Sequence, residues 1–276
     1  MKTALFYLSC AAAFGVFPAG AASYCIDFGP LSSAASYKYI STTKLQGWNN
    51  VAFSSDQTKT GDITFSSNYY GGDKDKTHEN ASGKEIIVYS TEGAGQSITM
   101  SGVKNGSSGN LSMIGGSGFA YAPDSLYKKF DPAADLTVMP STAYQDFVTA
   151  DHGASFTLTF SGLAAGVYHI SLAAGRTYAS GGTAPGASYS LNGVNRTIAG
   201  NDGAAGQYAG MLEWQEMEIG EDGTLTLTVS GLYDESKGEW SSAALNGLVM
   251  MQVPEPSAAF LNLLGMAGLA FRRRRG

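Results

Sequence analysis

The chain has 276 residues, a formal net charge of −6, and only 14% charged residues against 43% hydrophobic ones. This hydrophobic content is too high for a disordered polymer, while the charged fraction lies well below the ~25% of an average soluble domain. The acidic balance excludes a protein that holds nucleic acid or an anionic membrane by charge alone.

The first 22 residues have the pattern of a cleavable signal peptide. Lys2 supplies the positive start, residues 3–17 are apolar, and Ala19-Gly20-Ala21 offers small residues for cleavage. We therefore expect a signal-peptide helix over residues 1–22, export from the cytoplasm, and signal peptidase as a processing partner.

Residues 23–252 form the predicted ectodomain, which is one large β-domain. The signal peptide and the C-terminal segment together carry five of the 17 basic and one of the 23 acidic residues, which leaves a body charge of −10. Cys25 is the only cysteine of this body, so no internal disulfide is possible and the core must stabilise the fold. Alternation over Tyr24–Phe28 predicts a strand in which Cys25 is at least half-buried.

Apolar residues at every second position predict strands through most of the body. The cleanest runs are residues 155–160, 166–172, 212–219 and 224–229. We expect the first two to form a strand pair after the turn at Gly162–Gly166, and Gly220–Gly223 to join the last two as a hairpin. Further strands are predicted at residues 62–65, 85–89, 97–100, 143–149, 187–191 and 244–251.

Roughly ten or more short strands with Gly-rich turns indicate an all-β protein, a β-sandwich with Gly/Ser-rich loops. The runs at 26–29 and 244–250 are predicted to pair as first and last strands. Residues 31–122 are irregular, and either an elaborated sheet or long surface loops fit them. The order of runs over residues 143–251 resembles the galactose-binding-like jelly-roll family, which implies a jelly-roll-like sandwich.

No motif for enzymatic chemistry is evident, and we predict a non-catalytic protein. The serines lack the G-x-S-x-G elbow of an α/β-hydrolase. Three histidines lack paired zinc-ligand spacing, with one in a charged loop, one in a turn and one in a strand: His78, His152 and His169. A glycosidase needs two facing carboxylates. For Glu213, Glu216 and Glu218 we prefer a solvated strand face.

A metal site is not assigned. Residues 73–79 place oxygen-bearing side chains at alternate positions, as calcium ligands require. However, His78 stands where a calcium loop needs glycine, and two lysines oppose the cation. Asp27 could contribute to a calcium site of the kind seen in carbohydrate-binding jelly rolls. We predict no cofactor, with calcium as an open alternative.

Aromatic residues in polar segments are the strongest indication of a ligand. Sugar rings present apolar C–H faces that stack on Trp and Tyr, while their hydroxyls bond polar neighbours. Trp48 is predicted in a polar loop with Asn49 and Asn50. The candidates for carbohydrate binding are Trp48, Tyr178, Tyr208 and Trp240. The alternative is core packing, which we favour only for Trp214.

The C-terminal segment, residues 253–276, combines three elements in order. Pro254, Glu255 and Pro256 form a turn, residues 257–271 are apolar, and Arg272, Arg273, Arg274 and Arg275 follow. Arginines are retained on the cytoplasmic side of a membrane. The order resembles the PEP-CTERM sorting tail, which implies an exosortase as processing enzyme, a short hydrophobic helix and inner-membrane anchoring before processing. A plain anchor and a buried helix are the alternatives, because the apolar run is shorter than the ~20 residues of a full span.

These features predict an exported bacterial surface protein that ends at the cell surface or outside the cell. Its predicted role is non-catalytic binding or organising of extracellular polysaccharide, without a nucleic-acid partner. A structural matrix protein without a ligand and a glycan-active hydrolase are the two alternatives.

Overall fold

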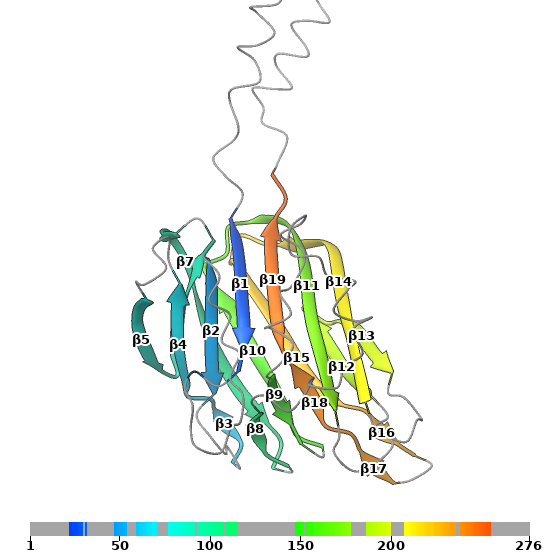
Figure 1. The fold of residues 1–276 in the computed structure, drawn as a ribbon. Coiled ribbons are helices and arrows are strands. Elements are labelled where there is room, and N and C mark those ends of the chain that lie inside the picture. The colour runs from blue at the N-terminus through cyan, green and yellow to red at the C-terminus, as the bar shows by residue number, and fades with distance from the viewer. Residues whose placement is uncertain are drawn as a thin grey trace, which may run out of the picture.

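The computed structural model describes residues 22–29, 31, 47–53, 59–70, 77–91, 93–107, 109–114, 147–151, 153–177, 186–199, 207–235 and 238–254. Within these ranges the protein is all-β, as predicted (Figure 1). They contain no helix that is long and apolar enough to cross a membrane. The two predicted terminal helices lie outside the described residues.

The first sheet has seven strands in the order β14-β11-β19-β1-β2-β4-β5. All neighbours are antiparallel except β1 and β2. The strands are β14 (Gln207–Ile219), β11 (Gly166–Thr177), β19 (Gly247–Gln252), β1 (Ser23–Phe28), β2 (Trp48–Phe53), β4 (Phe65–Tyr70) and β5 (Thr77–Gly83).

The second sheet also has seven strands, with β13-β12-β15-β10-β7-β3 in order and β6 paired to β7. The strands are β13 (Val194–Ala199), β12 (Gly186–Leu191), β15 (Thr224–Gly231), β10 (Ser155–Ser161), β7 (Gly93–Asn105), β3 (Gly61–Asp62) and β6 (Glu85–Ser90). Two small sheets complete the described fold: β18 (Ala243–Leu245), β9 (Phe147–Ala150) and β8 (Leu111–Ile114); and β16 (Tyr233–Asp234) with β17 (Glu239–Trp240).

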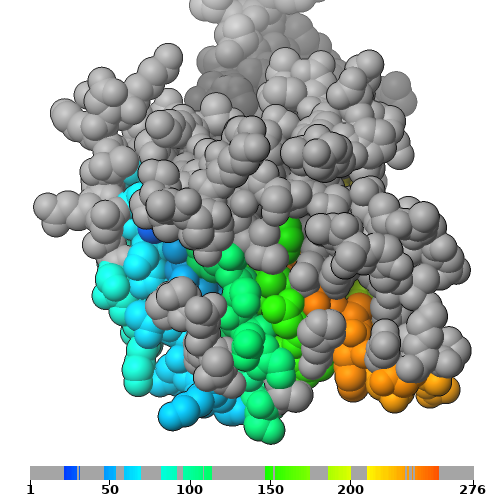
Figure 2. Space-filling view, turned by 60° about the horizontal axis from the view of Figure 1, so that its bottom comes forward, coloured from blue at the N-terminus to red at the C-terminus, as the bar shows by residue number. Residues whose placement is uncertain are grey.

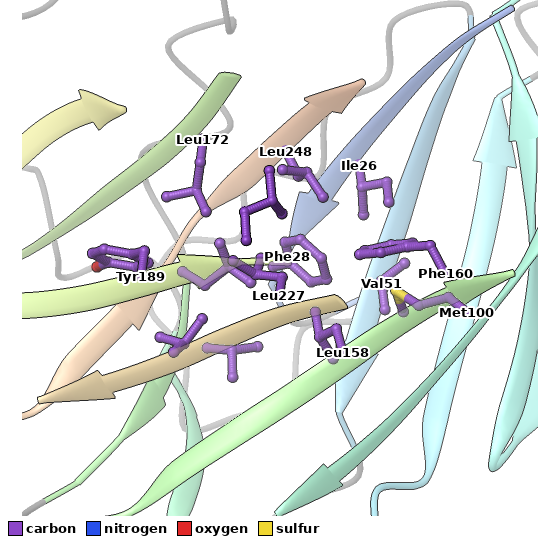
Figure 3. Packing of buried hydrophobic residues seen from close by; sticks show 14 of the residues in the cluster. Ile26, Phe28, Val51, Met100, Leu158, Phe160, Leu172, Tyr189, Leu227 and Leu248 are labelled. Carbon is purple, nitrogen blue, oxygen red and sulfur yellow. The ribbon is translucent and has the colours of Figure 1, made fainter. Parts of the chain in front are cut away.

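The core lies between the two large sheets, where alternate side chains of both point inward. Figure 3 shows Ile26, Phe28 and Leu248 from the first sheet facing Leu158 and Leu227 from the second. All five are fully buried. Burial of alternate residues on β10 and β15 follows directly from their sequence alternation, because successive side chains of a strand point to opposite faces.

The predicted pairing of the first and last strands is confirmed. β1 and β19 are antiparallel neighbours, in register from Ser23 opposite Met251 to Asp27 opposite Gly247. The main-chain N–H of Gln252 also donates to the carbonyl of Ala22 at 2.9 Å. The two ends of the ectodomain therefore leave the sandwich side by side.

Both predicted strand pairs with short turns are wrong. β10 and β15 belong to the second sheet, whereas β11 and β14 belong to the first, so each turn crosses between sheets. Alternation of apolar and polar residues indicates that one face of a strand is buried, but it does not indicate which sheet the strand joins. The two crossings contact each other, because Leu163 N–H donates to the Gly223 carbonyl at 3.1 Å. Gly223 has φ +62°, and a Cβ there would lie 2.5 Å from the Leu163 oxygen.

Other strand predictions agree to different degrees. The runs at 85–89, 97–100 and 187–191 lie in β6, β7 and β12. The run at 62–65 spans the end of β3 and the start of β4, and the run at 244–251 is divided at Asn246 into β18 and β19. Only residues 147–149 of the run at 143–149 are described, in β9. The region 31–122 contains β2 to β8, which fits an elaborated sheet.

Candidate functional site

Two exposed aromatic rings stand out among the described residues. Tyr233 and Trp240 are each 47% exposed and lie opposite each other on β16 and β17. Their ring centroids are 5.1 Å apart with the planes inclined at 50°. We call residues 233–240 the aromatic hairpin. The rings contact each other and still present much of their surface to solvent.

The base of the aromatic hairpin is bonded to the sandwich. Leu232 N–H donates to the Ser241 hydroxyl at 2.9 Å, and Ser241 N–H donates to the Leu232 carbonyl at 2.9 Å. The same hydroxyl donates to the carbonyl of Gly186, the first residue of β12. At Gly231, a Cβ would lie 1.9 Å from the backbone carbonyl oxygen of Ser241, so only glycine allows this approach. The hairpin base is therefore held at a defined position.

The tip of the hairpin needs a left-handed residue, which Gly238 supplies with φ +68°. Its position is close to Tyr233, whose hydroxyl oxygen lies 3.8 Å from where a Cβ would be. The segment carries three acidic residues and one lysine: Asp234, Glu235, Glu239 and Lys237. This local charge favours neutral or cationic ligands over anions.

The aromatic hairpin lies at the end of the sandwich opposite the start of β1 and the end of β19. In Figure 1, β1 begins and β19 ends at the top, whereas β16 and β17 are at the bottom. Figure 2 turns this bottom end forward. Residues from the C-terminal part of the described chain, coloured orange, lie at the surface there. Exposed rings held in this way can stack on the C–H face of a sugar ring.

The sequence candidates for carbohydrate binding are not all brought together. Trp240 belongs to the aromatic hairpin, whereas Tyr178 and the side chain of Tyr208 lie outside the described residues. Trp48 is 7% exposed in β2, not in a polar loop as predicted, and is not available for stacking. Tyr233 was missed, although its position before a polar, Gly-containing turn and Trp240 is a hairpin signal.

Asn49, next to Trp48, has a structural role in place of the predicted loop position. Its side-chain N–H group donates to the carbonyls of Cys25 at 3.1 Å and Tyr89 at 2.8 Å. Its side-chain oxygen accepts from Tyr89 N–H at 2.8 Å. This carboxamide joins β1 and β2 of the first sheet to β6 of the second. A buried amide with such bonds stabilises the fold and is not accessible to a ligand.

The remaining reactive groups do not form a catalytic cluster in the described part of the chain. Burial raises the pKa of the Cys25 thiol to about 12, so the thiol is protonated at neutral pH and unreactive. His169 is half-buried in β11, and the backbone of His78 lies in β5 and not in a loop. His152 lies outside the described residues.

The three glutamates of β14 lie on a solvated part of the strand, as preferred from the sequence: Glu213, Glu216 and Glu218 are exposed. Glu216 has φ +59° at the irregular pairing with β11. Within the described ranges no three His, Cys, Asp or Glu side chains gather as metal ligands. Of the segment 73–79, which was considered as a calcium loop, residues 73–76 lie outside these ranges. Asp27, the other calcium candidate, is buried in β1.

Comparison with protein families identifies the C-terminal segment. The model of the PEP-CTERM protein-sorting motif matches residues 252–275. Residues 252–275 carry the PEP-CTERM protein-sorting motif. The motif implies an exported protein, anchored through its C-terminal tail before processing by an exosortase-type enzyme. The PEP-CTERM motif begins at the last residue of β19, and Val253 N–H donates to the Val167 carbonyl at 2.7 Å.

No curated protein matches the chain. Among solved structures, the ANXUR2 extracellular domain from Arabidopsis thaliana is 12% identical, with a TM-score of 0.31, over 45% of this chain and 36% of its own. TmCBM61, solved with β-1,4-galactotriose, is 14% identical, with a TM-score of 0.28, over 55% and 88%. CBM35 from Cellvibrio japonicus Abf62 is 14% identical, with a TM-score of 0.21, over 38% and 72%. This chain spans about a third of the ANXUR2 structure. The fold is therefore assigned from the order and pairing of the strands and not from these similarities.

Proposed function

We propose that this exported protein binds extracellular polysaccharide without cleaving it, through the aromatic hairpin. The observation that carries the proposal is the pair of exposed rings of Tyr233 and Trp240, which contact each other on a base bonded to β12. Aromatic residues contribute large contact areas at low entropic cost, and rings that are already held lose little freedom on binding.

The position of the hairpin supports this role. The PEP-CTERM tail leaves the sandwich at the end of β19, and the aromatic hairpin lies at the other end (Figure 1). A protein held by its tail would direct the hairpin away from the membrane. We place the processed protein at the cell surface or outside the cell, after signal peptidase and an exosortase-type enzyme have acted.

Binding without hydrolysis is favoured by the exposed carboxylates near a surface hollow. A hollow of about 530 Å³ is lined by Asp62, Lys84 and Glu85 together with residues of β7. The Lys84 ammonium lies 2.8 Å from the Asp62 carboxylate, which raises the lysine pKa. A glycosidase needs one carboxyl group whose surroundings keep it protonated. Asp62 is exposed and already paired with Lys84, so it is not one of two free carboxylates that face each other across a cleft.

The test is binding of the purified full chain to an array of neutral, acidic and amino polysaccharides. We expect binding to a neutral or amino polymer, and a loss of about tenfold or more in affinity for Trp240→Ala and Tyr233→Ala. Tyr233→Phe is the matched control, because it keeps the ring and should retain binding. Gel mobility of the polymer after incubation should stay unchanged.

Each of three results would contradict the proposal. One is wild-type affinity in the Trp240→Ala, Tyr233→Ala double variant, which would show that the hairpin does not bind the polymer. Another is shortening of the polymer, which would favour the hydrolase alternative. The third is absence of binding to every polymer tested, which would favour a structural protein without a ligand.

A further inference from the structure

A second concave site lies at the side of the sandwich where the two sheets end. β13 is the last strand of one sheet and β14 is the last strand of the other. A hollow of about 420 Å³ lies there, lined by Arg196 from β13 and by Met211, Leu212, Glu213 and Gln215 from β14. We call it the β13–β14 slot. None of its residues belongs to the aromatic hairpin.

Arg196 is held in place by the side chain beneath it. Its guanidinium carbon lies 5.6 Å from the ring centroid of Trp214, which is 2% exposed. The indole N–H of Trp214 donates to the Val194 carbonyl at 3.1 Å, and this bond fixes the ring across the two sheets. Among the described residues Arg196 forms no ion pair. A guanidinium stacked on an indole keeps its N–H donors available in the plane of the group.

The other lining groups complement these donors. Glu213 supplies carboxylate acceptors, and Gln215 supplies both a donor and an acceptor. Met211 and Leu212 add apolar surface, with Leu212 packed against the core. Arg196 and Glu213 bring one positive and one negative charge, so the described residues of the lining have no net charge. A lining of donors, acceptors and apolar surface without net charge matches a neutral polyhydroxyl compound.

We infer that the β13–β14 slot is a second carbohydrate subsite, which binds a neutral sugar unit. Its volume lies at the lower end of small-molecule sites, ~300–1,000 Å³, which suits one or two sugar rings and not a long segment of polymer. The inference goes beyond the aromatic hairpin, since the slot can bind a free sugar whether or not the hairpin binds a polymer. If both sites bind one polymer, the second contact becomes intramolecular and raises overall affinity.

A structural role for Arg196 is the alternative. A charged side chain on an end strand discourages the strand from pairing with another chain. This role predicts that loss of the charge causes association of the protein and leaves sugar binding unaffected. The carbohydrate role predicts that Glu213 and Gln215 matter as much as Arg196.

The test is titration of the purified full chain with glucose, galactose and N-acetylglucosamine, and with glucuronate and glucosamine as charged comparisons. Saturation-transfer NMR and calorimetry measure binding. We expect binding of at least one neutral sugar and at least tenfold weaker binding in Arg196→Gln, in Glu213→Gln and in Gln215→Ala. Glu218→Gln is the matched control, because it changes an exposed glutamate of the same strand outside the slot.

The outcomes separate this site from the hairpin. Loss of sugar binding in Trp240→Ala but not in the slot variants would overturn the slot and support the hairpin. Loss in the slot variants but not in Trp240→Ala would support the slot alone. Preference for glucuronate, no binding of any neutral sugar by the wild-type chain, or unchanged binding with new self-association in Arg196→Gln would each overturn the inference. Glu213→Gln keeps the test valid if Arg196→Gln fails to fold.

Discussion

The two sides of the sandwich are closed in different ways. On the side of β6, the Asn49 carboxamide bonds both backbone groups of Tyr89, and the Tyr69 hydroxyl donates to the Ser90 carbonyl at 2.9 Å. The rings of Tyr69 and Tyr89 lie 4.9 Å apart. On the side of β13 and β14, the Trp214 indole N–H donates to the Val194 carbonyl, and the Arg196 guanidinium lies over the indole ring.

The difference teaches how a sandwich can separate stability from binding. Buried polar groups that are fully bonded join the sheets tightly on the β6 side. On the opposite side, the described residues join the sheets through the bond from the Trp214 indole N–H to the Val194 carbonyl, and polar side chains remain at the surface around a hollow. We expect substitutions on the β6 side to lower stability and substitutions in the slot to change binding.

The largest effect is expected for Asn49→Ala. The substitution leaves the buried Cys25 carbonyl and the part-buried N–H and carbonyl of Tyr89 without this partner, which should lower the free energy of unfolding by about 3 kcal/mol. Urea denaturation measures the loss. Asn195→Ala, an exposed asparagine of β13, is the control and should change stability by less than about 0.5 kcal/mol. Equal effects of both substitutions would remove the distinction between the two sides.

Alkaline pH should weaken the β6 side next. Burial raises the Cys25 pKa from 9.0 to about 12 in the folded protein, so folding favours the neutral thiol. The stabilisation is fully present below pH 9 and is lost as the pH rises toward 12. Burial raises the pKa values of Tyr24 and Tyr69 as well. Urea denaturation at pH 7, 9 and 11 should show a smaller decline in Cys25→Ala than in the wild type; identical slopes would contradict this assignment.

A moderate effect is expected for Trp214→Phe on the opposite side. Phenylalanine keeps an aromatic ring below Arg196 but loses the N–H bond to the Val194 carbonyl, which should cost about 1 kcal/mol. Thermal denaturation measures the change. A loss as large as that of Asn49→Ala would show that both sides stabilise the sandwich equally.

The smallest effect on stability is expected for Arg196→Gln. The guanidinium is exposed and its interaction with Trp214 contributes about 0.5–1 kcal/mol at such sites. Chemical denaturation should therefore detect little change, even where sugar binding falls tenfold. A loss above about 2 kcal/mol would make Arg196 a structural residue.

Strand prediction succeeded where one face of a strand is buried and the other is solvated. The runs at 155–160 and 224–229 alternate because β10 and β15 have this environment. β2 was missed because Asn49 and Asn50 are polar although buried, so its sequence shows no apolar alternation. A buried asparagine looks like a loop residue until its hydrogen-bond partners on a distant strand are known.

The binding surfaces needed contacts that no local pattern contains. Trp240 was a candidate from the sequence, but its partner Tyr233 and the bonded base at Ser241 became evident only when β16 and β17 were paired. The slot joins Arg196 to a stretch of β14 from a different sheet. Such sites depend on which strands end each sheet.

The sequence alone determined the features that depend on neighbouring residues: the order of turn, apolar run and arginines in the PEP-CTERM tail, and the alternation that makes an all-β core. Tertiary structure alone decided that the turns after β10 and β14 cross between sheets, that Trp48 is buried, and that Arg196 lies above Trp214. The physical reason is the separation along the chain of the residues that interact. Alternation and sorting motifs are read over adjacent residues, whereas burial and strand partners depend on residues far apart in the chain.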